Sequence, residues 1–300
     1  MFIQSTDSTQ QLHYSIWEPQ GKPKAILQLV HGMEEYIGRY TPLASALADM
    51  GWAVIGHDHL GHGQSGRWER GFFTDNDDGA SILIEDIHLI SKVAKERWGT
   101  LPLFIFGHSM GSFFLRRYLA EYSNEIDGAI ICGSGWYNAF LTGTGYYAAL
   151  LIGALRGKHT KDAFLTFLCS SPFANAFKED GKLAWLSKNK ENVRQYIADP
   201  LCGFGFTCEA YEHMYKNLFL VSKECNFSNM RPIPLLVISG ADDPVGGAKS
   251  VKKIANQYRE YGFTDVTERS IVGNRHEILF EDDAPETIKY IANWLGKRLN

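Results

Sequence analysis

The stretch FIFGHSMGSFFL, residues 104–115, joins a short apolar run, a polar interruption and a second apolar run. The interruption places Ser109 between Gly107 and Gly111, each two residues from the serine. Such a segment is typical of a buried strand that turns sharply into a helix, because glycine allows the backbone to turn without a clash. The same arrangement exposes a serine nucleophile at the end of a strand. The rest of the sequence must distinguish a plain turn from a nucleophile.

Short apolar runs recur along the chain on both sides of this segment. They are AILQLVH (25–31), AVIGHD (53–58), LFIFG (103–107), AIICG (129–133), LLVISG (235–240) and VTERSIV (266–272). Mostly continuous apolarity predicts strands that are buried on both faces, as parallel strands are under covering helices. Between these predicted strands, apolar residues recur at helical spacing, for example in residues 80–99. Strands and helices therefore alternate along the chain. The sequence therefore predicts an α/β fold with a mostly parallel, doubly wound sheet.

One interval between two predicted core strands, residues 134–231, is far longer than the others. A structureless loop of that length is implausible in a compact domain. Its segments DAFLTFL, LAWLSKN and AYEHMYKNLFLV have helical, amphipathic patterns. We therefore expect an α/β core formed by residues 1–133 and 232–300, with residues 134–231 inserted as a helical cap.

The composition restricts the class of protein. With 300 residues, of which 45% are hydrophobic and 21% charged, the chain suits a soluble globular protein with a large core. A formal net charge of −4 gives no reason to expect nucleic-acid binding.

The five cysteines are odd in number and match no zinc-binding spacing. They are Cys132, Cys169, Cys202, Cys208 and Cys225. We interpret them as reduced thiols of an intracellular protein. The first residues, MFIQSTDSTQQLHY, lack a basic segment followed by an apolar run, so no signal peptide is predicted and a cytoplasmic location is expected.

Polar residues that suit acyl transfer follow three of the predicted strands. Ser109, an aspartate in the segment GADDP and His276 occur in the chain order of an α/β-hydrolase triad. The serine needs a base to take its proton, histidine has a suitable pKa, and a carboxylate fixes the histidine tautomer. Asp242 and Asp243 compete for the acid, and Asp243 is the preferred candidate. Whichever of the two is not the acid is expected to be an aspartate of the turn.

An acyl-transfer site also needs hydrogen-bond donors for the developing oxyanion. The main-chain N–H of Met110, directly after the serine, is one candidate. The second is the N–H of Met33, in the loop after the strand that ends at His31-Gly32. The methionine side chains are then free to line an apolar site.

Histidines cluster near the same strand ends. His31, His57, His59, His62 and His108 are interpreted as structural groups near the cleft. A metal site is the rival interpretation for them, but no acidic or cysteine partner shares a ligand spacing with these residues. No metal or other cofactor is therefore expected.

Five motifs together resemble the monoacylglycerol lipase and lysophospholipase branch of the α/β-hydrolases. They are HGMEEYIGRY (31–40), HDHLGHGQSG (57–66), GHSMGS (107–112), SGADDPVG (239–246) and NRHEIL (274–279). The resemblance implies hydrolysis of single-chain glycerol or glycerophospholipid esters without a cofactor, by a triad of Ser109, Asp243 and His276. It also implies that the amides of Met33 and Met110 bind the oxyanion. Many relatives carry histidine in place of Tyr36, a difference we expect to alter the rim of the site.

The start of the predicted cap is rich in aromatic and aliphatic residues: Trp136, Tyr137, Phe140, Tyr146, Tyr147, Leu150, Leu151 and Ile152. Residues 128–155 carry no charge, yet they divide into a strand and a glycine-interrupted segment too short to span a bilayer. These side chains either pack the cap onto the sheet or bind an apolar ligand. Any that face outward would form a patch for contact with lipid or micelles.

A serine carboxylesterase acting on monoacylglycerols or similar small ester and lipid substrates is the favoured function. A general carboxylesterase for short-chain or aromatic esters is the alternative. A peptidase would need a charged anchor in the cap for the substrate terminus. A ligand-binding protein without turnover is disfavoured, because it would be free to lose one member of Ser109, Asp243 and His276.

Overall fold

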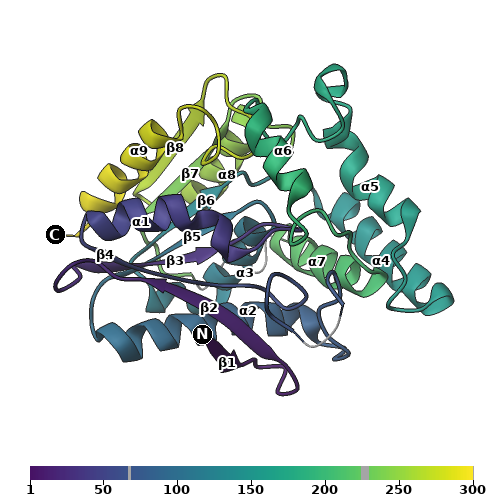
Figure 1. The fold of residues 1–300 in the computed structure, drawn as a ribbon, viewed down its shortest axis with the longest axis horizontal. Coiled ribbons are helices and arrows are strands. Elements are labelled where there is room, and N and C mark those ends of the chain that lie inside the picture. The colour runs from purple at the N-terminus through teal and green to yellow at the C-terminus, as the bar shows by residue number, and fades with distance from the viewer. Residues whose placement is uncertain (67–68, 224–229, 300) are drawn as a thin grey trace.

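The predicted parallel strands form the centre of an eight-stranded sheet in the computed structural model, which describes residues 1–66, 69–223 and 230–299 (Figure 1). The order is β1-β2-β4-β3-β5-β6-β7-β8. The predicted strands are β3 (Ala25–Val30), β4 (Trp52–His57), β5 (Leu103–His108), β6 (Gly128–Cys132), β7 (Leu235–Gly240) and β8 (Val266–Ile271). These six strands pair in parallel, and each lies within one residue of its predicted ends, which confirms this part of the sheet.

Two further strands, β1 (Phe2–Gln4) and β2 (Gln11–Trp17), extend one edge of the sheet and were not predicted. Strand β2 pairs antiparallel with both β1 and β4. Its apolar residues Leu12, Tyr14 and Ile16 alternate with polar ones. Antiparallel strands commonly alternate in this way because one face of the sheet meets solvent, so continuous apolarity does not identify them.

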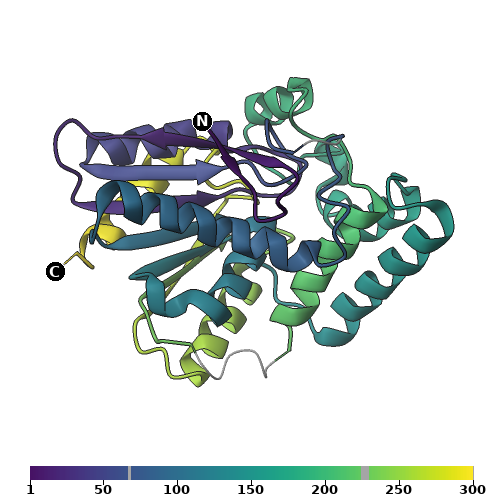
Figure 2. The ribbon, with the colours of Figure 1, turned by 90° about the horizontal axis from the view of Figure 1, so that it is seen from below.

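Helices cover both faces of the sheet, as expected for a doubly wound fold (Figures 1 and 2). Alternate residues of one strand point to opposite layers: Leu27 and Leu29 pack with one layer, whereas Ile26 and Val30 pack with the other. The first layer contains η1 (Ile37–Tyr40), α1 (Thr41–Asp49) and α9 (Ala284–Gly296). The second contains α2 (Gly79–Trp98), α3 (Met110–Tyr122) and α8 (Gly247–Glu260), with η2 (Ser123–Glu125) after α3.

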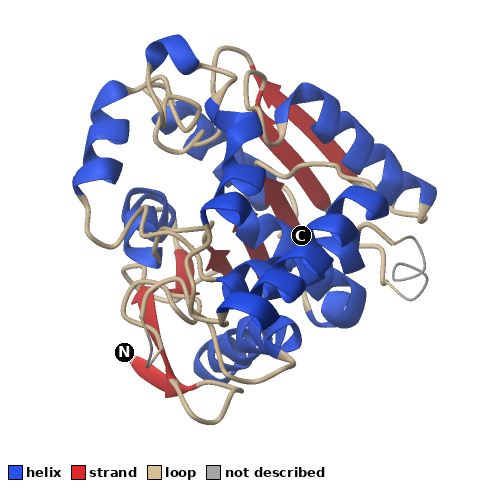
Figure 3. Ribbon diagram, turned by 90° about the vertical axis from the view of Figure 1, so that its right-hand side faces the viewer, coloured by secondary structure: helices blue, strands red, loops and turns tan. Residues whose placement is uncertain are grey.

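The long interval between β6 and β7 contains four α-helices within the described residues, at one end of the sheet (Figure 3). They are α4 (Ala139–Arg156), α5 (Ala163–Ala174), α6 (Lys190–Ala198) and α7 (Cys208–Val221), with η3 (Lys178–Asp180) after α5. Helix α7 packs against the core, where Asn217 Nδ2 donates to the carbonyl of Ala80 at 2.9 Å. The helical predictions for 162–168 and 210–221 are confirmed.

The helical prediction for residues 183–189 is wrong, because this segment forms turns. The carboxylate of Glu281 accepts hydrogen bonds from the Ser187 hydroxyl at 2.8 Å and the Lys188 N–H at 3.0 Å. The Asn189 side chain then caps α6. These side-chain acceptors bind backbone N–H groups that a helix would otherwise use, and helix α6 begins only after them.

Several of the apolar residues at the start of the inserted segment face outward. Phe140, Tyr147, Leu150 and Leu151 of α4 are exposed, whereas Tyr137 is half-buried. Among the described helices, none combines the length and the apolarity that a bilayer-spanning segment requires.

The described cysteines carry free thiols: Cys132, Cys169, Cys202 and Cys208. The fifth, Cys225, lies outside the described residues. Burial raises the pKa of the Cys169 and Cys202 thiols to about 12. These two side chains are accordingly neutral thiols at physiological pH.

Candidate active site

The turn after β5 holds Ser109 in a strained conformation. Its φ of +52° lies in the left-handed region, which is rare for a residue other than glycine. A Cβ at position 107 would lie 2.6 Å from the Gly111 carbonyl oxygen, and one at position 111 would lie 2.3 Å from that of Val30. Both glycines are therefore required by close backbone contacts. The turn matches the geometry of a nucleophile elbow.

The loops after β7 and β8 bring the other two predicted triad residues to this serine. His276 Nε2 lies 2.8 Å from Ser109 Oγ, and His276 Nδ1 lies 3.0 Å from Asp243 Oδ1. His276 and Asp243 are buried, whereas Ser109 keeps partial exposure. The three side chains thus form one continuous chain of hydrogen bonds that ends at an accessible hydroxyl.

The environment of Asp243 favours its ionised form. Burial alone would raise the pKa of this carboxyl, but the attraction of His276 and the surrounding hydrogen bonds hold it below its usual value. The donors include the Ser239 hydroxyl at 2.7 Å and the Val245 N–H at 2.8 Å. Asp242, the competing candidate, is exposed and lies 3.4 Å from the Lys188 ammonium. Only Asp243 of the two contacts the histidine.

Two main-chain N–H groups next to the serine have the properties of oxyanion donors. A Cβ on Gly32 would lie 3.1 Å from the Ser109 Cβ, so the turn at residues 32–34 contacts Ser109. Among the residues that the structure describes, neither the Met33 N–H nor the Met110 N–H donates a hydrogen bond. Both amides are therefore available to a ligand.

Two of the clustered histidines hold this turn in place. His31 Nδ1 lies 2.8 Å from the Gly32 carbonyl oxygen, while its Nε2 accepts the His59 N–H at 3.0 Å. His62 Nε2 accepts the Glu34 N–H at 3.2 Å. Burial lowers the pKa of His62 to about 3, so this ring is neutral and can act as an acceptor.

His57 and His59 are also buried, and within the described chain none of their ring nitrogens has a hydrogen-bond partner. Burial lowers the pKa of His57 to about 3. No group of three or more His, Cys, Asp or Glu side chains in the described residues is arranged to hold a metal ion. The histidine cluster is thus packed by ring contacts, such as the 4.4 Å between the centroids of His31 and His59.

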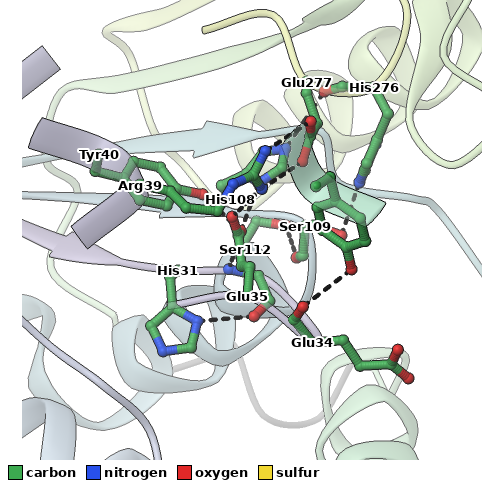
Figure 4. A network of polar contacts seen from close by, with 12 residues as sticks. His31, Glu34, Glu35, Arg39, Tyr40, His108, Ser109, Ser112, His276 and Glu277 are labelled. Atoms are coloured by element: carbon green, nitrogen blue, oxygen red, sulfur yellow. Dashed lines mark hydrogen bonds and ion pairs between the residues drawn. The ribbon is translucent and has the colours of Figure 1, made fainter. Parts of the chain in front are cut away.

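A buried ionic network lies beside the triad (Figure 4). Glu35 accepts hydrogen bonds from the Gly32 N–H at 2.6 Å, the Tyr40 hydroxyl at 2.8 Å and Arg39 at 2.6 Å, and it contacts His108 at 3.3 Å. Although burial opposes it, the Glu35 interaction raises the pKa of His108. The network therefore couples the turn at Gly32 to the residue before the serine.

Arg39 extends this network to the loop of His276. Its guanidinium also binds Glu277 through nitrogen–oxygen distances of 2.6 and 3.0 Å. Glu277 accepts a further hydrogen bond from Asn192 of α6 at 2.7 Å. One arginine thus joins the predicted oxyanion turn, the predicted base and the inserted helices.

A known protein family matches most of the chain. The family model Hydrolase_4, described as "Serine aminopeptidase, S33", matches residues 21–283. The chain belongs to this family. The match covers the serine turn and the loops of Asp243 and His276.

The relatives of the chain include two proteins that are named lipases of monoglycerides or monoacylglycerols. Monoglyceride lipase of Mus musculus is 25% identical over 297 residues, which is 97% of this chain and 88% of that protein. Monoacylglycerol lipase of Mycolicibacterium smegmatis is 26% identical over 290 residues, 95% of this chain and 93% of that protein. A carboxyl esterase structure from Bacillus coagulans, in complex with glycerol, superposes with a TM-score of 0.91 at 24% identity, covering 100% of this chain and 98% of that one. The fold is therefore that of an α/β-hydrolase.

Tyr36, the predicted departure from many relatives in this branch of the family, contacts the inserted segment. Its hydroxyl donates to Asp199 at 2.9 Å, and burial raises its pKa to about 12. The ring of Trp185, also in the inserted segment, lies 5.1 Å from the His276 ring. The segment between β6 and β7 therefore contacts both the predicted oxyanion turn and the predicted base.

The sequence did not single out Glu35, Arg39 or Glu277 as members of the site. The i,i+4 spacing of Glu35 and Arg39 in η1 and its flanks is a local signal for one ion pair. The contact of Arg39 with Glu277 has no local signal, because it joins distant parts of the hydrolase chain.

Proposed function

We propose that the chain is a serine hydrolase of carboxylic esters of the monoacylglycerol lipase type, acting on glycerol esters with one fatty acyl chain. The observation that carries this proposal is the unbroken hydrogen-bond path from Ser109 through His276 to Asp243, next to two free amides. The names of the two curated relatives support the choice of substrate.

In the proposed reaction, Ser109 Oγ attacks the ester carbonyl carbon while His276 Nε2 takes the hydroxyl proton. The N–H groups of Met33 and Met110 bind the negative oxygen of the tetrahedral intermediate. His276 then gives its proton to the leaving alcohol, and the C–O bond breaks to form an acyl-enzyme. A water molecule, deprotonated by His276, attacks the acyl carbon, and collapse releases the fatty acid and restores the serine. Asp243 holds the histidine tautomer and stabilises the imidazolium throughout.

We further propose that residues 134–231 act as a cap on the α/β core formed by residues 1–133 and 232–300. The contacts of Trp185 with His276 and of Asn192 with Glu277 support a position over the catalytic residues. In this arrangement the cap excludes water from the acyl-enzyme and contributes apolar side chains to acyl-chain binding.

The outer face of α4 and α5 is proposed to contact a lipid surface. Its exposed side chains include Leu155 of α4, 77% exposed, and Phe167 of α5, 62% exposed. A patch of exposed apolar residues on neighbouring helices is typical of a surface that enters a lipid interface. Contact there would bring the cap to the phase in which single-chain lipids reside.

The test is a series of monoacylglycerols and nitrophenyl esters of graded chain length, hydrolysed by the wild type and by Ser109→Ala. We expect long-chain esters to be preferred and the variant to lose nearly all activity. Full activity of Ser109→Ala would remove the mechanism. Preference for acetate or butyrate would instead favour the general carboxylesterase, and cleavage of aminoacyl amides in place of esters would favour a peptidase.

A further inference from the structure

The loop that carries His276, the proposed base, lies between the end of β8 at Ile271 and the start of α9 at Ala284. A base must be held to within about 0.5 Å of its working geometry by its neighbours. A base on a loop therefore depends on contacts from other parts of the chain. These contacts decide how well the His276 ring is placed against Ser109.

Three successive residues of this loop bind three successive carbonyl groups of the inserted segment. The Arg275 guanidinium donates through Nη1 to the carbonyl oxygen of Ala184 at 2.7 Å. The N–H groups of His276 and Glu277 donate to the carbonyl oxygens of residues 185 and 186, at 3.4 and 2.7 Å. The main chain of the proposed base is thus bonded directly to the inserted segment.

The carbonyl groups are available to the loop because residues 183–189 form turns. In an α-helix the carbonyl of Ala184 would accept the N–H four residues later. That N–H, of Lys188, instead donates to Glu281 at 3.0 Å. The Ala184 carbonyl is thereby left to Arg275. Turns in place of the predicted helix therefore supply the acceptors that the loop after β8 uses.

Arg275 joins the two segments through three kinds of contact. Besides the Ala184 carbonyl, its guanidinium binds the Asp180 carboxylate at 2.5 Å and lies 3.8 Å from the ring centroid of Phe177. The side chain is only 9% exposed, although it carries a charge. Burial of a charge is unfavourable unless good partners offset it, so residues 177–184 fix the place of this guanidinium.

A shift of the main chain at Arg275 would move the next residue, His276. The ring of His276 lies 2.8 Å from Ser109 Oγ and 3.0 Å from Asp243 Oδ1. Both contacts must stay within hydrogen-bond reach for the proton to be transferred. The anchor at Arg275 therefore bears on the proposed chemical step.

We propose that Arg275 is a positioning residue, whose guanidinium anchors the loop of His276 to the inserted segment and thereby holds the imidazole at Ser109. The proposal rests on the proposed hydrolase function and deepens it. The inserted segment then serves the chemical step as well as substrate binding. A displaced base slows proton transfer after the substrate has bound, so the loss should appear in kcat.

The experiment measures kcat and KM for a dissolved short-chain nitrophenyl ester, together with the free energy of unfolding in urea. We expect kcat of Arg275→Met to fall roughly tenfold to hundredfold, as a small misplacement of a reacting group does, with KM changed far less. Because His276 serves both formation and hydrolysis of the acyl-enzyme, kcat falls whichever step limits the rate. Arg275→Lys keeps a positive charge near Asp180 without the planar fork, so kcat should recover in part. It keeps the test available should Arg275→Met not fold.

Arg298→Met is the matched control. Arg298 also binds an aspartate, Asp265, at 2.6 Å, donates to the carbonyl of Trp294 at 3.0 Å and lies 4.0 Å from the centroid of that aromatic ring. Its side chain is 15% exposed. The C-terminus next to it lies at the opposite end of the molecule from α4 and α5 (Figures 1 and 2). We expect the two Met variants to lose similar free energies of unfolding, whereas only Arg275→Met loses kcat.

A second readout does not depend on the class of substrate. Ser109 Oγ attacks the phosphorus of a fluorophosphonate and fluoride leaves, so the rate of labelling reports how well His276 activates the serine. We expect labelling to slow in Arg275→Met in parallel with kcat and to keep the wild-type rate in Arg298→Met. Ser109→Ala should not be labelled.

An unchanged kcat in Arg275→Met, or equal losses of kcat in both Met variants, would overturn the inference, because the arginine would then act only through overall stability. A rise in KM without a fall in kcat would overturn it as well, since Arg275 would then serve binding alone. These results leave the hydrolase proposal intact as long as Ser109→Ala is inactive. An active Ser109→Ala would remove the proposed function, and this inference with it.

Discussion

Near the proposed triad, at the carboxyl ends of the strands, charged side chains are buried and partnered, whereas helices α4 and α5 expose apolar side chains to the outside. Arg39 is 8% exposed and lies between two carboxylates that are each 3% exposed, while Leu155 is 77% exposed. A buried charge is tolerated only with good partners, so the first region depends on every member of its network. An exposed leucine contributes little to folding, so the second region is free to serve a surface function. Substitutions should therefore have large effects in the first region and small ones in the second.

The largest expected effect is that of Asp243→Asn on turnover. The amide cannot hold the His276 tautomer that accepts a proton from Ser109, so kcat should fall on the order of 10⁴-fold. Because asparagine has nearly the same shape as aspartate, the substitution should leave the fold intact. Hydrolysis of a dissolved nitrophenyl ester measures the loss, and Asp242→Asn, next in the chain and paired with Lys188, serves as the control. A reversal, with Asp242→Asn inactive and Asp243→Asn active, would show that the acid is misassigned.

Arg39→Met should have the next largest effect, on stability. It leaves Glu35 and Glu277 buried without their shared cation, and breaking such a pair costs about 3–5 kcal/mol. Urea denaturation followed by circular dichroism gives the free energy of unfolding. Arg97→Met removes an exposed ion pair with Glu18 and should change the midpoint little. Equal losses in both variants would contradict the buried network.

Acid should destabilise the protein through the buried histidines. His57 has a pKa of about 3 in the folded chain, lowered by burial, against 6.5 as the ordinary value. The unfolded chain therefore binds a proton that the folded chain does not, and stability falls as pH drops from 6.5 toward 3, by about 2 kcal/mol at pH 5 for this residue. His62 acts in the same direction, while the raised pKa of His108 opposes it.

The measurement is the urea midpoint at pH 7, 6 and 5 for the wild type and His57→Phe. The variant keeps a ring but no titrating nitrogen, so its midpoint should decline less steeply with acid. Asp243 has a lowered pKa, so the stability that its ionised form contributes is lost only as the pH falls through the ordinary carboxyl range. That range lies below pH 5, the lowest pH of this measurement. Identical slopes for the two proteins would mean that His57 is not the titrating group.

Local patterns explain which features the sequence could predict. Five of the six parallel strands are buried apolar runs, whereas β8 is partly exposed. Ser109, Asp243 and His276 follow the ends of parallel strands, where an open α/β sheet gathers its ligands. The ion pair of Arg39 with Glu277 depends on how two distant loops meet in the folded chain. The spacing of residues along the sequence does not predict such a contact. The positive φ of Glu34, +55°, likewise depends on residues distant in the sequence, because His62 and Tyr196 bind its backbone. Long-range polar contacts were therefore the part that required the structure.

The smallest effect on stability is expected on the outer face of α4 and α5. Leu155→Glu and Phe167→Glu replace exposed side chains, so the free energy of unfolding should change by less than about 0.5 kcal/mol. Hydrolysis of a dissolved short ester should persist, because neither residue contacts the triad. Binding to vesicles of neutral phospholipid, measured by co-sedimentation, should weaken in each variant and further in the double variant. Ile197→Glu, at an exposed apolar residue on α6, is the control. If vesicle binding depended equally on Ile197, the lipid contact would not belong to α4 and α5, and the contrast between the two regions would lose its functional meaning.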